Sequence, residues 1–545
     1  MGNRTQMAGF PEFDRRGISG HRYAPPLKHA AVCCVVLAAI VPAASPAMPP
    51  AARAPASAPS HEGRASAVRQ FSVTFARDFL DRPYTGRVWV MTARSSRREP
   101  RFGPNWFNPT PMFAVEVVDW APETPLVLGE NALAYPAPIS ESQLDGLRVQ
   151  AVMAVNPDAR KPGTGAGDGY SDVLRLDADA VRDQPIPLRI TNSVKPRPFR
   201  GTGRIRPFEI VSRGLTKFHG REIRLTAAVI LPAQFDEATE RRFPTLYIFP
   251  GFGQTRWTAP MYVRPTHEGE TQLVQVLLDG DCATGVHQFA DSAVNGPYGQ
   301  ALVEELIPAL EMEFRLIPEA TARFLTGHSS GGWASLWAQI THPDYFGGVW
   351  ATSPDPVDFR HLVGVNIYET GANVFRDAAG QPRPLARRTV GGDDKVIITW
   401  KQFSDMDRVV GRGEQLGSLQ AVFSPRGPDG GPAPLYDRMT GAVDPAVAKA
   451  WEKYDVRLVL ERGWQRLAAR LKGKIHVYAG SKDTFYLEGA VRLLKASLSE
   501  LESDADIRIL DGYDHSTIMR APELRGIHRE IAKVYRRHHS EDAGS

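Results

Sequence analysis

The first regular pattern along the chain is an alternation of apolar and polar residues, in which Phe71, Val73 and Phe75 fall on one face. A period of two is typical of β-strands with one buried face. Strand-like segments recur before residue 204, between turns rich in proline and glycine, at residues 71–75, 88–91, 113–118, 147–155 and 187–190. This pattern predicts an all-β, sandwich-like domain over residues 65–203.

Beyond residue 204, short apolar runs alternate with amphipathic segments. Residues 299–314, for example, place Leu302, Leu306 and Leu310 on one stripe, as a helix would. The expected strands of this region are residues 223–231, 244–249, 273–278, 322–326, 348–352, 474–479 and 507–510. Alternation of strand and helix is typical of a mostly parallel sheet with helices on both faces, so an α/β domain is expected over residues 204–538.

The alternation breaks between residues 355 and 454, where segments rich in glycine and proline, such as residues 425–432, replace it. A stretch of about a hundred residues between core strands is too long for a plain connection. It leaves the sheet at the carboxyl end of a strand, the edge where ligands bind in open α/β sheets. We interpret residues 355–454 as an insertion placed to form a lid or a substrate wall. The simpler alternative is a set of loops without such a role.

One short motif indicates a catalytic serine. Residues 327–331 (GHSSG) match G-x-S-x-G, the nucleophile elbow, in which a sharp turn between a strand and a helix holds a serine at the tip of a sheet. Glycines flank the serine because the turn strains its backbone and brings neighbouring chain close. The pattern selects Ser329 as the nucleophile rather than Ser330, which would need a glycine where His328 stands.

A serine nucleophile needs a base and an acid that orients the base, and both follow in the order Ser, Asp, His. Asp483 and His515 each follow an expected strand. Parallel strands bring their carboxyl ends to one edge, so Ser329, Asp483 and His515 are predicted to meet there. His515 would take the Ser329 proton, and Asp483 would hold the imidazole. Asp514 and Asp355 are the competing candidates for the acid.

Acyl transfer also needs hydrogen-bond donors for the oxyanion of the transition state. One is expected to be the backbone N–H of Ser330, directly after the nucleophile. The other is expected from the loop after the strand at residues 244–249, which reads Pro-Gly-Phe-Gly. Its glycines let the backbone approach a ligand, and the N–H of Phe252 is the first choice, with Gly251 second.

Length, composition and charge are those of a large folded protein and not those of a nucleic-acid-binding protein. The 545 residues exceed one ordinary domain, and a hydrophobic content of 42% is enough for large cores. The formal net charge of +4 is spread along the chain, with no basic stripe of the kind that binds nucleic acid. Cys282 is the one cysteine outside the N-terminal apolar segment, so core burial rather than disulfides is expected to stabilise the fold.

Residues 1–48 have the plan of an export signal, because a basic stretch precedes an apolar run and a zone of small residues follows it. The apolar run, residues 30–41, has about a dozen residues, fewer than the ~20 that span a bilayer, so no permanent anchor is expected. Residues 49–64 are rich in Pro, Ala and Ser and are expected to be a disordered linker. The protein is therefore predicted to be exported, either to a periplasm or out of the cell.

Three other features receive no functional role from the sequence. Residues 163–169 are rich in glycine but lack the spacing and the strand-to-helix context of a phosphate loop. Trp106, Phe107 and Trp120 form a candidate ligand platform, but we interpret them as core or loop anchors. Four polar residues near the expected site match no metal template and are interpreted as substrate-contacting or structural residues: Asp279, His287, Asp291 and Asn295. No metal is expected.

With these motifs in order, residues 204–535 resemble the family of putative esterases among the α/β-hydrolases, which includes esterase D-like enzymes, feruloyl esterases and enterochelin esterases. The matching segments are residues 217–220, 228–232, 250–253, 327–331, 480–483 and 514–515. The resemblance implies an α/β-hydrolase fold and hydrolysis of carboxylic esters without a cofactor. In one departure, Pro250 stands where many relatives carry the histidine of an H-G-x-G loop.

The leading hypothesis is an exported serine esterase that cleaves a small-molecule or glycan-linked ester through an acyl-enzyme. Two alternatives stay open: an acyltransferase of the same fold, and a non-catalytic surface or glycan-binding protein. The sequence assigns neither the acyl and alcohol parts of the substrate nor an oligomeric state.

Overall fold

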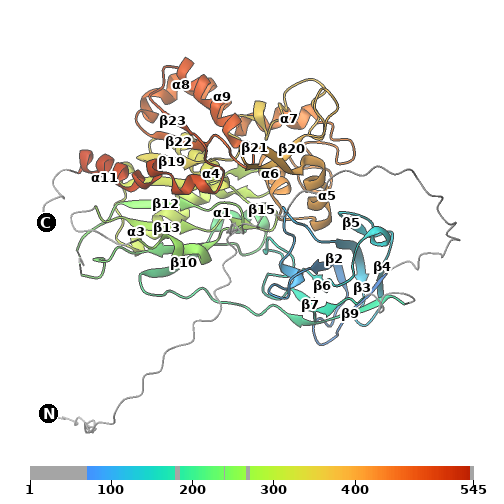
Figure 1. Cartoon of the computed structure of the whole chain (residues 1–545). Helices are drawn as coiled ribbons and strands as arrows, with labels where there is room; N and C mark the ends of the chain where they lie inside the picture. The colour runs from blue at the N-terminus through green and yellow to red at the C-terminus, as the bar shows by residue number, and fades with distance from the viewer. Residues whose placement is uncertain (1–69, 178–183, 238–239, 265–270, 540–545) are drawn as a thin grey trace, which may run out of the picture. The chain divides into compact units, whose positions relative to one another are not determined.

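The computed structural model describes residues 70–177, 184–237, 240–264 and 271–539 (Figure 1). The predicted export segment at residues 1–48 and the predicted linker at residues 49–64 lie outside the described residues. In the part of the chain that is described, no helix has the length and apolar character needed to cross a membrane.

The first nine strands form one hydrogen-bonded sheet, drawn in blue to teal in Figure 1. They are β1 (Phe71–Phe75), β2 (Tyr84–Ala93), β3 (Met112–Trp120), β4 (Leu126–Leu128), β5 (Leu133–Tyr135), β6 (Arg148–Met153), β7 (Gly169–Ser171), β8 (Leu174–Arg175) and β9 (Ile186–Ser193). Their order is β4-β1-β9-β7-β6-β2-β3-β5, with β8 beside β6, and only the pair β1 and β9 is parallel. The five strands expected from the sequence are present, and the pattern misses the four shortest.

This N-terminal sheet resembles a sandwich in its packing but not in its hydrogen bonding. Phe71 of β1 and Phe113 of β3 are separated in the sheet by β9, β7, β6 and β2, yet their ring centroids lie 5.8 Å apart. The sheet therefore folds over on itself and encloses the alternating apolar positions, among them Val73, Val88 and Val149. The expected domain thus consists of one curled sheet rather than two separate ones.

The second large sheet has eight strands in the order β10-β11-β13-β12-β18-β19-β22-β23. They are β10 (Ile205–Val211), β11 (Arg224–Ile230), β12 (Thr245–Phe249), β13 (Val274–Leu278), β18 (Arg323–His328), β19 (Gly348–Thr352), β22 (Ile475–Gly480) and β23 (Asp506–Leu510). The pairs β10–β11 and β11–β13 are antiparallel, and all later pairs are parallel. A mostly parallel sheet is what the sequence predicts, although its pattern misses β10.

Helices cover both faces of this sheet, as expected. They are α1 (Arg213–His219), α2 (Tyr298–Ala301), α3 (Ile307–Glu313), α4 (Ser330–Thr341), α8 (Val456–Leu471), α9 (Leu487–Glu500), α10 (Pro522–Arg525) and α11 (Ile527–His538). Alternate residues of β12 show the two layers: Leu246 and Ile248 pack in the core that includes α11, whereas Tyr247 and Phe249 pack in the core that includes α3, α4, α8 and α9. A π-helical turn at Leu302–Leu306 interrupts the single helix expected over residues 299–314.

The segment between β19 and α8 contains ordered structure that the sequence pattern does not predict. It holds the hairpin β20 (Pro384–Val390) and β21 (Asp393–Thr399), followed by α5 (Trp400–Val410), α6 (Gln415–Phe423) and α7 (Pro445–Trp451). Two smaller hairpins precede α2: β14 (Asp281–Cys282) with β15 (Gly285–Val286), and β16 (Asp291–Ser292) with β17 (Gly296–Pro297). The end of α5 contacts the N-terminal sheet, because Trp89 Nε1 donates a 3.0 Å hydrogen bond to the Val409 carbonyl.

Candidate active site

Ser329 occupies a strained turn between β18 and α4. Its φ and ψ are 59° and −125°. This conformation is unfavourable in free energy for any residue that carries a side chain. A Cβ at Gly327 would collide with the Gly331 carbonyl, and a Cβ at Gly331 would collide with the Phe249 carbonyl. The two glycines of the motif are therefore required by close backbone contacts, and the turn presents Ser329 as a nucleophile elbow does.

Asp483 and His515 lie together at the same edge of the sheet. Asp483 follows β22 and is fully buried, and its Oδ2 lies 2.9 Å from Nδ1 of His515, which follows β23. The backbone N–H of Phe485 donates to the other carboxylate oxygen at 2.9 Å. A carboxylate on Nδ1 fixes the imidazole tautomer and leaves Nε2 to exchange protons.

The ring of His328 shows that His515 lies next to the elbow. The ring centroids of His328 and His515 are 4.5 Å apart, and His328 directly precedes Ser329. Among the described residues, Ser329 Oγ has no hydrogen-bond partner, so the structure places the serine near the Asp483–His515 pair without joining it to the histidine. Such bonds are often long in the absence of substrate and tighten when it binds.

Burial and charge act in opposite directions on the two groups. Burial lowers the pKa of His515, but the carboxylate of Asp483, and next that of Asp355, outweigh it and hold the pKa above the usual 6.5. Burial raises the pKa of Asp483, but the charge and hydrogen bond of His515 keep it below 3.8. The pair therefore favours a carboxylate beside an imidazole that readily accepts a proton.

The two competing acids are occupied elsewhere. Asp514 accepts hydrogen bonds from the backbone N–H groups of Ser516 and Thr517 in a tight turn. Asp355 follows β19 and accepts from Ser330 Oγ at 2.7 Å. Of the three acids considered, the structure bonds only Asp483 to His515.

The Asp355 carboxylate is the centre of a buried polar network that sequence reasoning missed. Gln288 Nε2 and Gln415 Nε2 donate to the same Oδ2 at 3.2 Å and 2.9 Å. Gln415 also donates to Ser330 Oγ at 3.1 Å, so the first residue of α6 reaches the residue beside the nucleophile. Glutamine has no signature in a sequence motif, and its partners here lie 60 or more residues away.

Replacing Asp355 by asparagine tests how this network acts on His515. We expect Asp355→Asn to move the acid limb of the kcat/KM profile to lower pH, because the variant loses a negative charge that raises the His515 pKa. The asparagine Oδ1 can accept the three hydrogen bonds that Oδ2 of Asp355 accepts. Bonds to a neutral acceptor are weaker than bonds to a carboxylate, so the free energy of unfolding should fall by about 1–3 kcal/mol. The measurements are a pH–rate profile and urea unfolding; an unmoved acid limb would show that Asp355 does not act on the histidine.

The loop after β12 offers one free candidate for the oxyanion. The backbone N–H of Gly251 donates to Gln254 Oε1 at 2.9 Å, so the second choice from the sequence is already engaged. Neither Phe252 nor Ser330 uses its backbone N–H in a hydrogen bond within the described chain, and Ser330 begins α4, where N–H groups are unpaired. These two donors are the ones available to a developing negative charge.

The four polar residues weighed as metal ligands are engaged in local contacts. The His287 ring stacks on Tyr298 with centroids 3.6 Å apart, and burial lowers its pKa to about 3. Thr284 donates to Asn295, Gln300 donates to Asp291, and Thr226 donates to Asp279. Nowhere in residues 70–177, 184–237, 240–264 and 271–539 do three or more His, Cys, Asp or Glu side chains gather into a group that could hold a metal.

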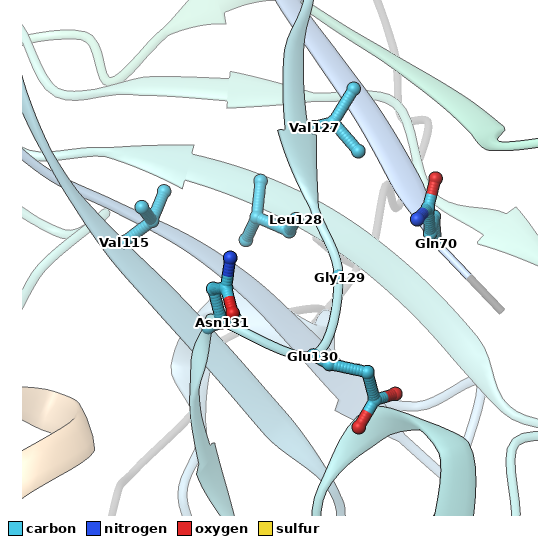
Figure 2. A pocket seen from close by; sticks show the side chains of 8 residues that line it. Gln70, Val115, Val127, Leu128, Gly129, Glu130 and Asn131 are labelled. Carbon is cyan, nitrogen blue, oxygen red and sulfur yellow. The ribbon is translucent and has the colours of Figure 1, made fainter. Parts of the chain in front are cut away.

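A separate hollow of about 380 Å³ lies in the N-terminal sheet (Figure 2). Its apolar lining includes Val115, Val127 and Leu128. Its one acid, Glu130, already accepts hydrogen bonds from the backbone and the hydroxyl of Ser140. The hollow holds none of the residues discussed above and offers no nucleophile.

Known proteins resemble this chain in sequence and in structure. A sequence model of the family described as "Putative esterase" matches residues 220–530, more than half of the chain. A solved ferulic acid esterase is 13% identical and matches over 61% of this chain and 98% of its own, with a TM-score of 0.37. An S-formylglutathione hydrolase from Agrobacterium tumefaciens is 16% identical over 63% and 96%, with a TM-score of 0.35.

A third structure, a ferulic acid esterase from Anaeromyces mucronatus solved in complex with ferulic acid, is 15% identical over 62% of this chain and 94% of its own, with a TM-score of 0.31. These TM-scores are low, so the family assignment rests on the sequence match alone. No curated protein sequence matches the chain.

Proposed function

The chain belongs to the putative esterase family of carboxylic ester hydrolases, and on this premise we propose that Ser329, His515 and Asp483 hydrolyse esters through a covalent acyl-enzyme. The observation that carries the proposal is the strained serine turn at the sheet edge where the buried Asp483–His515 pair lies.

In the proposed mechanism His515 Nε2 accepts the Ser329 proton while Oγ attacks the acyl carbonyl. The N–H groups of Ser330 and Phe252 stabilise the oxyanion, and Asp483 stabilises the imidazolium. The tetrahedral intermediate collapses, the bond to the alcohol oxygen breaks, and His515 returns the proton to that oxygen. Water, activated by the same imidazole, then attacks the acyl-enzyme and releases the acid and free Ser329.

The insertion at residues 355–454 is proposed to form part of the substrate wall. Gln415 supports this role, because it contacts both Asp355 and the hydroxyl of Ser330. Export to a periplasm or out of the cell is likewise a proposal, supported by the sequence of residues 1–48. The substrate is proposed to be a small-molecule or glycan-linked ester, with water as the acyl acceptor.

Covalent labelling with a fluorophosphonate tests the nucleophile directly. An activated serine displaces fluoride from phosphorus and forms a stable Oγ–P bond, whereas ordinary serines react poorly. We expect one adduct, located by mass spectrometry at Ser329, and its loss after His515→Ala. The control Ser330→Ala keeps the nucleophile and should still be labelled. Labelling at another serine, or none on the folded protein, would contradict the proposal.

A further inference from the structure

Two consecutive aromatic residues from the connection between β2 and β3 lie against the candidate active site. Trp106 packs on Phe252 with ring centroids 5.4 Å apart. Phe107 packs on Phe485 with ring centroids 6.1 Å apart. Phe252 carries a candidate oxyanion N–H, and Phe485 lies edge-on to the His515 ring at 5.0 Å. One short segment of the N-terminal sheet thus contacts both the oxyanion loop and the aromatic residue beside the histidine.

Specific contacts hold this segment in place. Trp106 Nε1 donates a 2.7 Å hydrogen bond to Oε2 of Glu414, the residue before α6, and its ring meets Phe403 of α5 edge-on at 5.0 Å. Glu414 is buried, which raises the pKa of its carboxyl. Asn105 Oδ1 accepts from the backbone N–H of Phe107 at 3.0 Å. The insertion and the segment's own hydrogen bonds therefore fix both rings.

The aromatic rings at this place lie at the margin of the hydrophobic core, and Trp106, Phe107 and Phe485 pack against it. Trp106, Phe107, Phe252 and Phe485 are all half-buried and keep exposed surface, whereas Trp120 is 7% exposed and packs on Phe75 inside the N-terminal sheet. The interpretation as core or loop anchors therefore fits Trp120 fully, and fits Trp106 and Phe107 in part because both pack against the core. Trp106 and Phe107, the other two of these three aromatic residues, keep apolar surface that a ligand can contact.

Reaction chemistry indicates which part of an ester would meet this surface. Asp483 holds Nδ1 of His515, so Nε2 is the atom that protonates the departing alkoxide. The alcohol part must therefore leave beside the imidazole. Phe485 flanks that ring, and Phe107 lies directly against Phe485.

We propose that Phe107, in the connection between β2 and β3, is a specificity-determining residue, which with Phe485 forms an apolar surface for the alcohol part of the ester. Trp106 is a positioning residue that acts through Phe252. The surface favours alcohols that carry an aromatic or other apolar group. The proposal rests on the proposed function but goes beyond the family, because Trp106 and Phe107 lie outside the matched residues 220–530.

The test compares benzyl acetate with methyl acetate, which share the acyl group and differ in the apolar part of the alcohol. An aromatic contact of this type has a modest free energy, so Phe107→Ala is expected to lower the ratio of kcat/KM for benzyl over methyl acetate about two- to tenfold. Phe107→Leu keeps apolar volume without the ring and should give a smaller fall. For Trp106→Phe, kcat should fall for both esters with little change in KM.

Trp120→Phe is the matched control, because it alters a buried tryptophan of the same sheet away from the site. We expect it to change thermal stability but not the ratio. An unchanged ratio in both Phe107 variants, while hydrolysis still depends on Ser329, overturns this inference and leaves the proposed function standing. Absence of hydrolysis of any ester by the wild-type chain overturns both.

Discussion

Ser329→Ala is expected to lower kcat for ester hydrolysis by about 10⁴- to 10⁶-fold, because no other group can form the acyl-enzyme and only the oxyanion donors and substrate binding remain. The measurement is initial-rate hydrolysis of a chromogenic short-chain ester by the purified variant. A variant that keeps the wild-type rate would remove Ser329 from the mechanism.

Two control variants separate chemistry from folding. Ser330→Ala keeps the nucleophile and the backbone donor and loses the hydrogen bond to Asp355, so its rate should fall by about tenfold or less. Ser329→Gly should be as inactive as Ser329→Ala. It should nevertheless unfold at the same temperature as the wild type or at a higher one. Glycine adopts a φ of 59° without the steric cost that a Cβ brings. Loss of stability in Ser329→Gly would contradict the strain assigned to the elbow.

The second large effect is expected at His515. His515→Ala should lower kcat/KM by about 10²- to 10⁴-fold, the range for a positioned general base. In the wild type, kcat/KM should fall as the pH decreases through the pKa of His515 in the substrate-free enzyme, because only a neutral imidazole accepts the serine proton. Since the folded-state pKa is raised, the midpoint of this acid limb should lie above pH 6.5. The measurement is kcat/KM for a neutral ester between pH 5 and 9.

His328 provides the control for this profile. Its ring lies beside His515, but burial first, and the charge of His515 next, lower its pKa to about 3, so it stays neutral across the assay range. His328→Gln should therefore retain the acid limb at an unchanged or slightly altered pH. A profile that is flat between pH 5 and 8 in the wild type would argue against His515 as the base.

Much of the fold follows from short stretches of sequence. Each of the five expected strands of the N-terminal sheet is present, and β11, β12, β13, β18, β19, β22 and β23 lie where apolar runs predict them. The pattern misses the shortest strands, and it also misses β10, β20 and β21, which have seven residues each. The strands β4, β5, β7 and β8 have two or three residues each. The helices α5–α7 lie in a segment expected to be irregular because of stretches such as residues 425–432, although α5 itself contains neither glycine nor proline.

The sequence favoured Asp483 as the acid, but it could not exclude the two competitors. Chain order supplied three acids for His515, and only the folded structure shows the 2.9 Å bond from Asp483 and the separate use of Asp355. For the oxyanion, the sequence ranks Phe252 before Gly251, and the structure adds that Gln254 already accepts from the Gly251 N–H. Hydrogen bonds of this kind join residues that are far apart in the sequence. The residues that lie between the two partners give no indication of the pairing.

By itself, the sequence determined the elbow, because the five residues of the motif specify it, although the contact that requires Gly331 comes from Phe249 in another strand. It also determined the alternation that puts several strand ends at one edge. Only the tertiary structure shows the bond between Asp483 and His515, the contact of Gln415 with Ser330, and the position of Trp106 and Phe107 against the site. The physical reason is the distance along the sequence over which each interaction acts. Backbone strain and periodicity are local, whereas these contacts join residues 32 to more than 300 positions apart.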